Sequence, residues 1–417
     1  MRPLEGVRVI DMTVAVAGPI AGQVLGHMGA EVIRVEPPFG RALAGLHVAP
    51  PREGAPDRPY NRILLYNDFN RSKLGVTLDL TKEKGRETLL RLVAISDLVI
   101  ENMSPRALPG LWLDYAHLRD ARDDIILVSM PAFGATGPLR DRTAYGPGID
   151  AMSGLSWLTG YPDRGPLKPG NYYCDQNAGL LAAFAALAAL RYRRRTRRGQ
   201  HVELSMLEGE VQLVGEALLD YAMNGRVQGR TGNRHPYMAP HGAYPCAGDD
   251  RWLAIAVESD AEWQALCEVM GRPELGCDQR FVDVVSRVRH REEVDALVAA
   301  WTRGQEHREV QRRLQEAGVP AGAALSASEL FENPQLRARG YFRTIEHPEA
   351  GAMPHGQLAW RLSATPSPPE RPAPCFGQHN DYVLREMLGM SDSEVAELAE
   401  AEIIAYEPLE GEAQDAP

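Results

Sequence analysis

Residues 7–36 read VRVIDMTVAVAGPIAGQVLGHMGAEVIRVE, and this stretch decides the fold. Both of its ends are apolar runs rich in β-branched residues, which are typical of buried strands. Between them Gly18-Pro19 predicts a turn, and residues 20–29 have the composition of a helix. Strand, turn, helix and strand in this order predict a βαβ unit with a right-handed crossover in a parallel sheet.

The same pattern continues along the chain. A helical segment at 81–96 precedes the apolar DLVIEN at 97–102, and another at 115–124 precedes IILVSM at 125–130. The parallel sheet is therefore expected to extend to about residue 130. The Ala/Leu-rich helix predicted at 176–195 is apolar almost all round, so we expect it to be buried, and the strand-like HVELSM follows it.

A chain of 417 residues exceeds what one hydrophobic core usually supports, so more than one domain is expected. Glycines and prolines in NGRVQGRTGNRHPYMAPHG, residues 224–242, indicate a passage between lobes. Beyond it lie a predicted strand, RWLAIAV, and a helix for which Ser259 is the expected cap. We predict an α/β fold with a Rossmann-like large domain (1–224 and 321–417, including a C-terminal tail) and a smaller α+β domain (225–320).

Composition limits the function. Lys plus Arg number 45 against 56 Asp plus Glu, and the net charge of −11 argues against a nucleic-acid binder. The five cysteines form no CxxC pair and the histidines no HExxH pattern, so neither a disulfide framework nor a metal site is expected. The longest apolar run is far shorter than the ~20 residues of a membrane span. We expect a cytoplasmic protein that makes no membrane contact.

Asp175 stands directly before the predicted apolar helix. Free backbone N–H groups and the helix dipole favour a negative charge there, so we expect an ionised carboxylate. Where water is excluded, such a carboxylate is a competent nucleophile toward a thioester. Simple helix capping explains the same position, and the residues alone leave both readings open.

A dinucleotide site fits this sequence poorly. Gly18, Gly22 and Gly26 follow the first predicted strand in steps of four, whereas the pyrophosphate turn requires G-x-G-x-x-G. Close packing of the helix on the sheet explains these glycines more simply.

Several segments, in order along nearly the whole chain, resemble class III CoA-transferases, the family of formyl-CoA transferase and carnitine CoA-transferase. They are LEGVRVIDMT, AGPIAGQVLGHMGAEVIRVEPP, NRSKLGVTLDL, DLVIENMSPRAL, YYCDQNAG, RRGQHVELSM, GVPAGAALSASELFENPQLRARGYF and FGQHNDYVLREML. The resemblance implies that Asp175, in CDQNAG, is the nucleophile that carries an acyl group. It also implies an acyl-CoA and a carboxylic acid as substrates, with no permanently bound cofactor.

The resemblance further maps the family's CoA pocket onto this chain. The matching residues are Ala15, Val16, Ala17, Asn70, Arg71, Lys73, Asn102, Met103, Arg106 and Tyr145. Two features depart from the pattern of formyl-CoA transferase. Tyr145 is followed by Gly146 in place of a glutamate, and GNRHPYMAPHG replaces the run of glycines that forms a closing loop.

Two alternative activities remain open from sequence. The α-methylacyl-CoA racemases resemble the same fold but need a histidine where this chain has Tyr145, and tyrosine, with an ordinary pKa near ~10, is a poor acid/base partner. An isomerase that transfers CoA within one molecule would use the same aspartate. The resemblance also implies a homodimer in which two ring-shaped chains interlock.

Overall fold

The computed structural model describes residues 2–41, 47–365 and 371–410. The chain forms two compact units, each described here by itself. Unit 1 is drawn from residues 1–156, 168–227 and 340–417, and unit 2 from residues 157–167 and 228–339. The domain boundaries at 225 and 321 inferred from sequence stay predictions.

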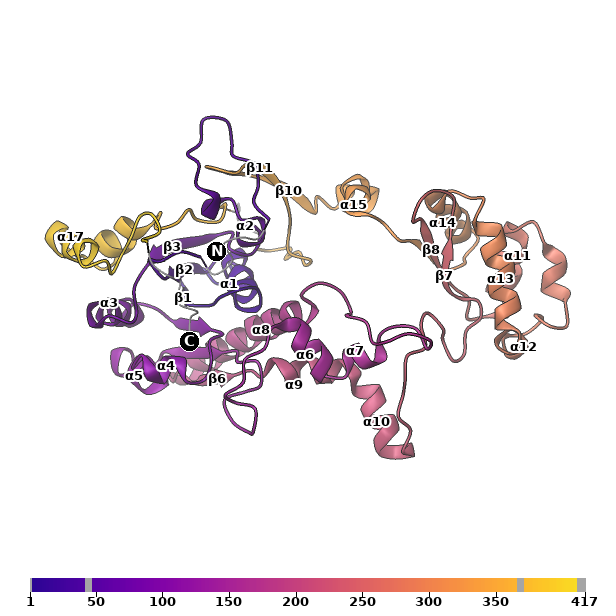
Figure 1. The fold of residues 1–417 in the computed structure, drawn as a ribbon, viewed down its shortest axis with the longest axis horizontal. Coiled ribbons are helices and arrows are strands. Elements are labelled where there is room, and N and C mark those ends of the chain that lie inside the picture. The colour runs from indigo at the N-terminus through magenta and orange to yellow at the C-terminus, as the bar shows by residue number, and fades with distance from the viewer. Residues whose placement is uncertain (1, 42–46, 366–370, 411–417) are drawn as a thin grey trace. The chain divides into compact units, whose positions relative to one another are not determined.

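Unit 1 is built on a six-stranded parallel sheet with the strand order β3-β2-β1-β4-β5-β6. Figure 1 labels β1, β2, β3 and β6 of this sheet. The strands are β1 (Arg8–Asp11), β2 (Glu31–Glu36), β3 (Lys73–Thr77), β4 (Leu98–Glu101), β5 (Ile126–Ser129) and β6 (His201–Glu203). This sheet confirms the predicted α/β class and five of its strands. The edge strand β3 is the one that the sequence analysis did not expect.

The helices of unit 1 include α1 (Ala17–His27), α2 (Leu64–Phe69), α3 (Glu83–Ala94), α4 (Ala107–Gly110), α5 (Tyr115–Ala121), α6 (Gly146–Met152), α8 (Tyr173–Thr196), α9 (Met206–Val211), α10 (Gly215–Asn224) and α17 (Asp392–Glu400). Some of them cover the two faces of the sheet. One apolar core joins the sheet to α3, α5 and α17, and another joins the opposite face to α1 and α8. Neighbouring residues of one strand, such as Val9 and Ile10, therefore belong to different cores.

Helix α1 begins at Ala17, so Gly18 and Pro19 lie in its first turn and do not form a separate turn before it. Proline is tolerated there because the first-turn N–H groups have no partner within the helix. A Cβ atom on Gly22 would lie 2.4 Å from the Asp11 carboxylate and 3.0 Å from the Lys73 ammonium. Close packing of α1 on the sheet is thus the reason for this glycine.

The long helix α8 is buried on one side only, contrary to the expectation that it is buried all round. Its small residues face the sheet and α1; they are Ala178, Gly179, Ala182, Ala183, Ala186 and Ala189. Leu180 and Phe184 lie exposed on another side of the helix. An apolar sequence shows that a surface must be covered, but it does not show whether this chain or a partner covers it.

The last part of unit 1 returns to the edge strand β3. The Asn380 side chain accepts a hydrogen bond from the Thr77 N–H at 2.9 Å and donates one to the Ala405 carbonyl at 2.9 Å. The antiparallel hairpin of β10 (Phe342–His347) and β11 (Gly351–Gly356) also belongs to this unit. Residues 411–417 of the predicted C-terminal tail lie outside the described residues.

Unit 2 combines a three-stranded antiparallel sheet with short helices. Its strands are β7 (His241–Pro245), β8 (Trp252–Ala256) and β9 (Ala321–Ala323), in the order β7-β8-β9. Its helices are α11 (Asp260–Val269), α12 (Val284–Arg289), α13 (Arg291–Thr302), α14 (His307–Glu316), α15 (Ala327–Glu332) and α16 (Pro334–Ala338). Ser259 caps α11 in a capping box with Glu262, which confirms the predicted start of this helix.

Candidate active site

The carboxyl ends of β1 and β4 mark the point where the strand order of the sheet reverses. Asn102, directly after β4, accepts a hydrogen bond from the Val14 N–H at 2.7 Å and donates one to the Val14 carbonyl at 2.9 Å. These two hydrogen bonds to the backbone of Val14 fix the β1–α1 turn, in which Ala15 takes a left-handed φ of 59°. Open α/β sheets bind ligands at such a switch point.

Asp175 lies beside this turn. It belongs to the first turn of α8 and is 9% exposed, while Tyr172 precedes the helix without a side-chain cap. A Cβ atom on Gly179 would lie 2.6 Å from the Ala17 carbonyl oxygen, so α8 packs closely on the start of α1. The structure thus brings Asp175 close to Ala17, the last of the three predicted CoA contacts in the β1–α1 turn. The roles of nucleophile and CoA pocket stay predictions.

The pKa of Asp175 differs from the expectation of a stabilised carboxylate. Burial raises the pKa of its carboxyl most, the charge of Asp150 raises it further, and the Ala17 backbone N–H opposes the change. The net pKa is above the ordinary value, because loss of hydration outweighs the favourable helix N-terminus. From the sequence we expected the helix N-terminus to stabilise the Asp175 anion. In the structure burial and the charge of Asp150 destabilise this anion.

Gly146 is packed against the Asp175 carboxylate. It begins helix α6, and a Cβ atom there would lie 2.1 Å from Asp175 Oδ2. Any side chain at this position would displace the carboxylate. The glycine that replaces the family's glutamate is therefore required by close packing. Tyr145, next to it in sequence, is 82% exposed.

Asp150 and Glu210 form a buried acidic pair beside Asp175 that the sequence analysis missed. Asp150 lies on α6 and Glu210 on α9, and both are almost inaccessible to solvent. The pKa of Glu210 is raised to about 8, first by burial and then by the neighbouring Asp150. No local pattern joins these two residues, although an acid at Asp150 within an otherwise apolar turn of α6 was a usable signal.

Lys73 lies inside the protein and is not exposed to a ligand. Its ammonium donates to Asp11 Oδ2 at 2.7 Å, to the Pro19 carbonyl at 2.8 Å and to Asn70 Oδ1 at 3.0 Å. Burial lowers the pKa of Lys73 to about 8, against the opposing charge of Asp11. All three of its N–H bonds are used within the protein, which leaves none for a CoA phosphate.

Asp11 is the centre of this buried network. Burial alone would raise the pKa of its carboxyl, but Lys73 and Arg34 together lower it. Its Oδ1 atom also accepts a hydrogen bond from the Thr13 N–H at 2.9 Å. The network ties β1, β2, β3 and the start of α1 together, so Lys73 supports the β1–α1 turn from inside.

The other predicted CoA contacts differ in accessibility. Asn70 is buried and donates to the Tyr66 carbonyl, and Arg71 donates to the Asp68 and Gly356 carbonyls at 3.0 and 3.1 Å. Arg106 is exposed, and its guanidinium pairs with Asp141 at 2.6 Å. Among the three predicted basic contacts, Arg106 is the one whose charge faces solvent.

Met103 is half-buried and lies beside Glu101, a second carboxyl whose pKa is raised. Its N–H donates to Glu101 Oε2 at 2.8 Å. Burial raises the pKa of Glu101 to about 7, against hydrogen bonds from Ser129 and Met103 that favour the anion. This carboxyl lies at the C-terminal end of β4, so the switch point combines titratable groups with an ordered turn.

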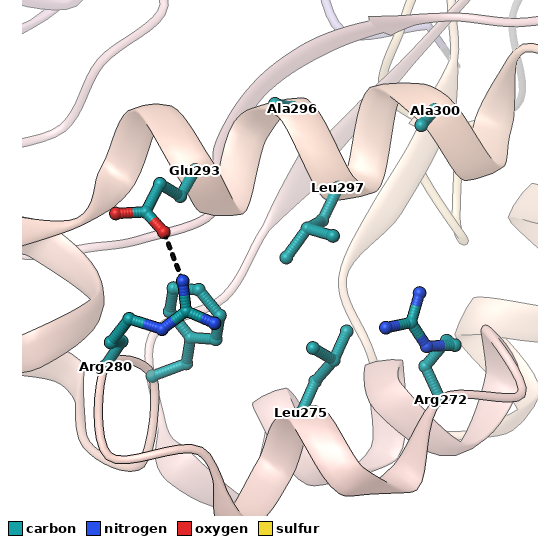
Figure 2. Close-up of a pocket in the computed structure, with 8 residues that line it drawn as sticks. Arg272, Leu275, Arg280, Glu293, Ala296, Leu297 and Ala300 are labelled. Atoms are coloured by element: carbon teal, nitrogen blue, oxygen red, sulfur yellow. Dashed lines mark hydrogen bonds and ion pairs between the residues drawn. The ribbon is translucent and has the colours of Figure 1, made fainter.

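Unit 2 contains a pocket of about 390 Å³ that none of the predicted site residues lines (Figure 2). Its lining consists of Arg272, Leu275, Arg280, Phe281, Glu293, Ala296, Leu297 and Ala300. Arg280 bonds Glu293 at 2.6 Å and Asp278 at 2.7 Å, and Arg272 bonds Glu274. Both arginines are paired with acids, so the candidate active site is the one in unit 1.

Neither a metal-binding cluster nor a membrane-spanning helix is found in the described parts of the chain. No group of three or more His, Cys, Asp or Glu residues within 2–41, 47–365 and 371–410 is arranged to hold a metal ion. Within these ranges, too, no helix is long and apolar enough to cross a membrane.

Comparisons with known proteins agree with the geometry. The model of CoA-transferase family III matches residues 4–380. Succinyl-CoA–D-citramalate CoA-transferase of Chloroflexus aurantiacus is 36% identical and aligns with 97% of this chain and 98% of its own length. Succinate–glutarate CoA-transferase of Agrobacterium fabrum is 34% identical over 92% of this chain and 96% of its own length.

A solved structure shows the same likeness. The crystal structure of a CAIB/BAIF family protein from Brucella suis has a TM-score of 0.84 and 31% sequence identity, and covers 93% of this chain and 99% of its own. Family model, relatives and fold agree over nearly the full chain. This protein therefore belongs to CoA-transferase family III, as the resemblance of its sequence predicted, and is a class III CoA-transferase.

Proposed function

We propose that this enzyme moves CoA from an acyl-CoA to a carboxylic acid through a covalent intermediate on Asp175. The carboxylate attacks the thioester carbonyl, the C–S bond breaks, and CoA leaves as a thiolate with its electron pair. The thiolate then attacks the aspartyl carbonyl of the mixed anhydride, which releases the donor acid and leaves an aspartyl-CoA thioester. The acceptor carboxylate reverses both steps, so no net proton is transferred.

The observation that carries this proposal is the buried, poorly solvated carboxylate of Asp175 at the switch point of the sheet. Burial and Asp150 hold its pKa above the ordinary value, so the anion is destabilised, and this cost in free energy is relieved when an acyl group neutralises it. Gly146 leaves the space next to Asp175 Oδ2 without a side chain.

We further propose that CoA lies along the β1–α1 turn at Ala15, Val16 and Ala17, against Met103 and Tyr145, with Arg106 near its phosphates. Arg106 supports this role because its guanidinium is exposed and charged. We assign Asn70, Arg71, Lys73 and Asn102 the supporting role of holding the turn and the neighbouring strands. Each of these four side chains donates a hydrogen bond to a backbone carbonyl.

Succinyl-CoA is the donor that we propose to test first, because one relative is named for succinyl-CoA and another for succinate. Dicarboxylic acids of the size of citramalate and glutarate are the matching acceptors. We also propose a cytoplasmic location, supported by the five unpaired cysteines, since disulfides are rare in reducing compartments.

We propose an interlocked homodimer as the assembled form. The support comes from the exposed apolar side of α8, with Leu180 and Phe184, and from the exposed Leu219 and Met223 on α10. Large apolar side chains exposed on each of these two helices are typical of a surface that a partner covers. A second copy of this chain is the occupant that the family resemblance predicts.

The deciding experiment compares wild type with Asp175→Asn on a panel of acyl-CoA donors and carboxylic acids. We expect wild type to exchange CoA between two acids, and hydroxylamine to trap the acyl group on the peptide that contains Asp175. Asp220→Asn is the control, because it alters another buried carboxyl of unit 1 that pairs with Arg226 at 2.7 Å.

Three results would contradict the proposal in different ways. Full activity of Asp175→Asn would exclude the covalent route. Deuterium uptake at the α-carbon without an acceptor would indicate a racemase. Rearrangement of one acyl-CoA with no exchange into an added acid would indicate the intramolecular isomerase.

A further inference from the structure

The acidic pair of Asp150 and Glu210 has no place in the reaction described so far. Asp150 is 1% exposed and Glu210 is 0% exposed. None of their four carboxyl oxygens accepts a hydrogen bond of ordinary geometry from a donor among the described residues. Two buried carboxylates without donors would repel each other strongly, so the pair requires a proton to be stable.

One proton between the two carboxyls resolves this repulsion. Burial raises the pKa of Glu210 to about 8, and the neighbouring Asp150 raises it as well. With a pKa of about 8, Glu210 keeps its proton at neutral pH, and this proton is the donor that Asp150 lacks. The Ser153 hydroxyl and the Cys174 thiol lie near Glu210 and lower its pKa, but they offset only part of the increase. The pair thus carries one negative charge in a buried position.

This charge acts on Asp175. Helices α6, α8 and α9 pack around one apolar cluster, which contains Ile149 next to Asp150, Cys174 next to Asp175, and Met206 of the helix that carries Glu210. At this position the charge of Asp150 raises the pKa of Asp175. On α8 itself, Cys174 is the neighbouring titratable group, and burial followed by Glu210 raises the pKa of its thiol, which stays neutral. Helix α1 contributes the Ala17 N–H, which favours the Asp175 anion.

We propose that Asp150 and Glu210 are positioning residues for Asp175. The two carboxyls share one proton and so carry one negative charge, and this charge beside Asp175 strengthens it as a nucleophile. The inference rests on the proposed attack of Asp175 on a thioester. Repulsion between two anions is present before the attack and disappears when acylation neutralises Asp175. The pair therefore destabilises the free carboxylate more than the acylated one, and this difference lowers the barrier.

Two variants separate the charge of the pair from its proton. Glu210→Gln keeps a hydrogen-bond donor toward Asp150 and so keeps the charge, but it cannot titrate. Asp150→Asn combined with Glu210→Gln removes the charge, and its two amides can still bond each other. The single Asp150→Asn is less informative, because Glu210 can then ionise in its place. The comparison of the double variant with Glu210→Gln therefore isolates the charge.

Carboxyl ¹³C NMR gives a readout that does not depend on activity. We label aspartate and glutamate carboxyls, assign Asp175 with Asp175→Asn, and titrate each protein. We expect the Asp175 carboxyl to titrate at lower pH in the double variant than in Glu210→Gln. In wild type a glutamate carboxyl is expected to titrate near pH 8 and to be missing from Glu210→Gln.

The pH profile of kcat/KM provides the second readout. We expect its acid limb to move to lower pH in the double variant, and the plateau to fall by at most about tenfold for each pKa unit lost by Asp175. A purely structural role would lower the plateau and leave the acid limb in place. Equal titration of Asp175 in Glu210→Gln and in the double variant would overturn the inference.

Other outcomes also decide between the two proposals. If the double variant does not fold, the absence of any wild-type glutamate carboxyl that titrates near pH 8 would still overturn the inference. If Asp175→Asn transfers CoA normally, the proposed function fails, whatever the NMR titrations show. If Asp175→Asn is inactive and the Asp175 titration does not respond to the pair, only the inference fails.

Discussion

At the scale of single residues, the site depends on space as much as on charge. Gly146 and Asp175 are far apart in sequence, yet a Cβ atom on the glycine would fall 2.1 Å from the carboxylate oxygen. The start of α6 therefore limits where the Asp175 carboxylate can lie. Reaction rates are sensitive to such limits, because a displacement of the nucleophile by about 1 Å can cost on the order of 100-fold in rate.

We predict that Gly146→Ala lowers kcat on the order of 100-fold by displacing the Asp175 carboxylate. Gly148→Ala is the matched control, because it lies on the same helix and its Cβ would meet its nearest atom, Ala144 Cβ, at 3.7 Å. Steady-state kinetics and thermal unfolding of both variants check this. Equal kcat values for the two variants would show that the contact with Asp175 is unimportant.

Glu210 makes a second prediction, which concerns stability. The pKa of this carboxyl is about 8 in the folded protein against 4.5 for the free side chain. Between these values the folded state binds more protons than the unfolded state, so the free energy of unfolding falls as pH rises. Glu210→Gln removes this loss. We expect the variant to gain stability relative to wild type between about pH 5 and about pH 9, on the order of 3 kcal/mol.

Urea unfolding of both proteins at the two pH values measures this gain. A difference between variant and wild type that is the same at both would show that Glu210 has an ordinary pKa in the folded state.

At the scale of elements, a loop after one strand fixes the turn after its neighbour. Asn102 follows β4 and holds both backbone polar groups of Val14, which follows β1. Parallel strands bring their carboxyl ends to the same edge of a sheet, so a short side chain can bridge the two loops. The buried Lys73 supports the same turn from β3 through the Pro19 carbonyl.

We predict that Asn102→Ala raises the KM for acyl-CoA, because Val14 loses two hydrogen bonds, each lost partner costing about 1–3 kcal/mol. The control is Ser259→Ala, which removes the cap of α11 in unit 2 and should cost about 1 kcal/mol of stability. Its KM should stay at the wild-type value. Kinetics together with thermal unfolding separate the two effects, and an unchanged KM for Asn102→Ala would contradict this role for the turn.

At the scale of the whole molecule, the apolar composition of α8 has two consequences. Its alanines and Gly179 pack within unit 1, while Phe184 is 71% exposed. We predict that Phe184→Asp weakens the proposed homodimer, because a charge on this surface must lose its hydration on association. Light scattering over a range of concentrations measures the change, with Trp112→Asp as a control at another exposed aromatic residue. An unchanged dimer would place the interface elsewhere.

The α/β class, most strands of the sheet, the capped start of α11 and the family could all be predicted from the amino-acid sequence. These follow from hydrophobic periodicity, turn residues and motifs, which are local in the chain. The three-dimensional packing was needed to show that Lys73 is buried at the start of strand β3, that α8 keeps an exposed side, and that Asp175 is close to Asp150. Burial and the pKa of a carboxyl depend on which distant segments pack around it, and no local pattern contains that information.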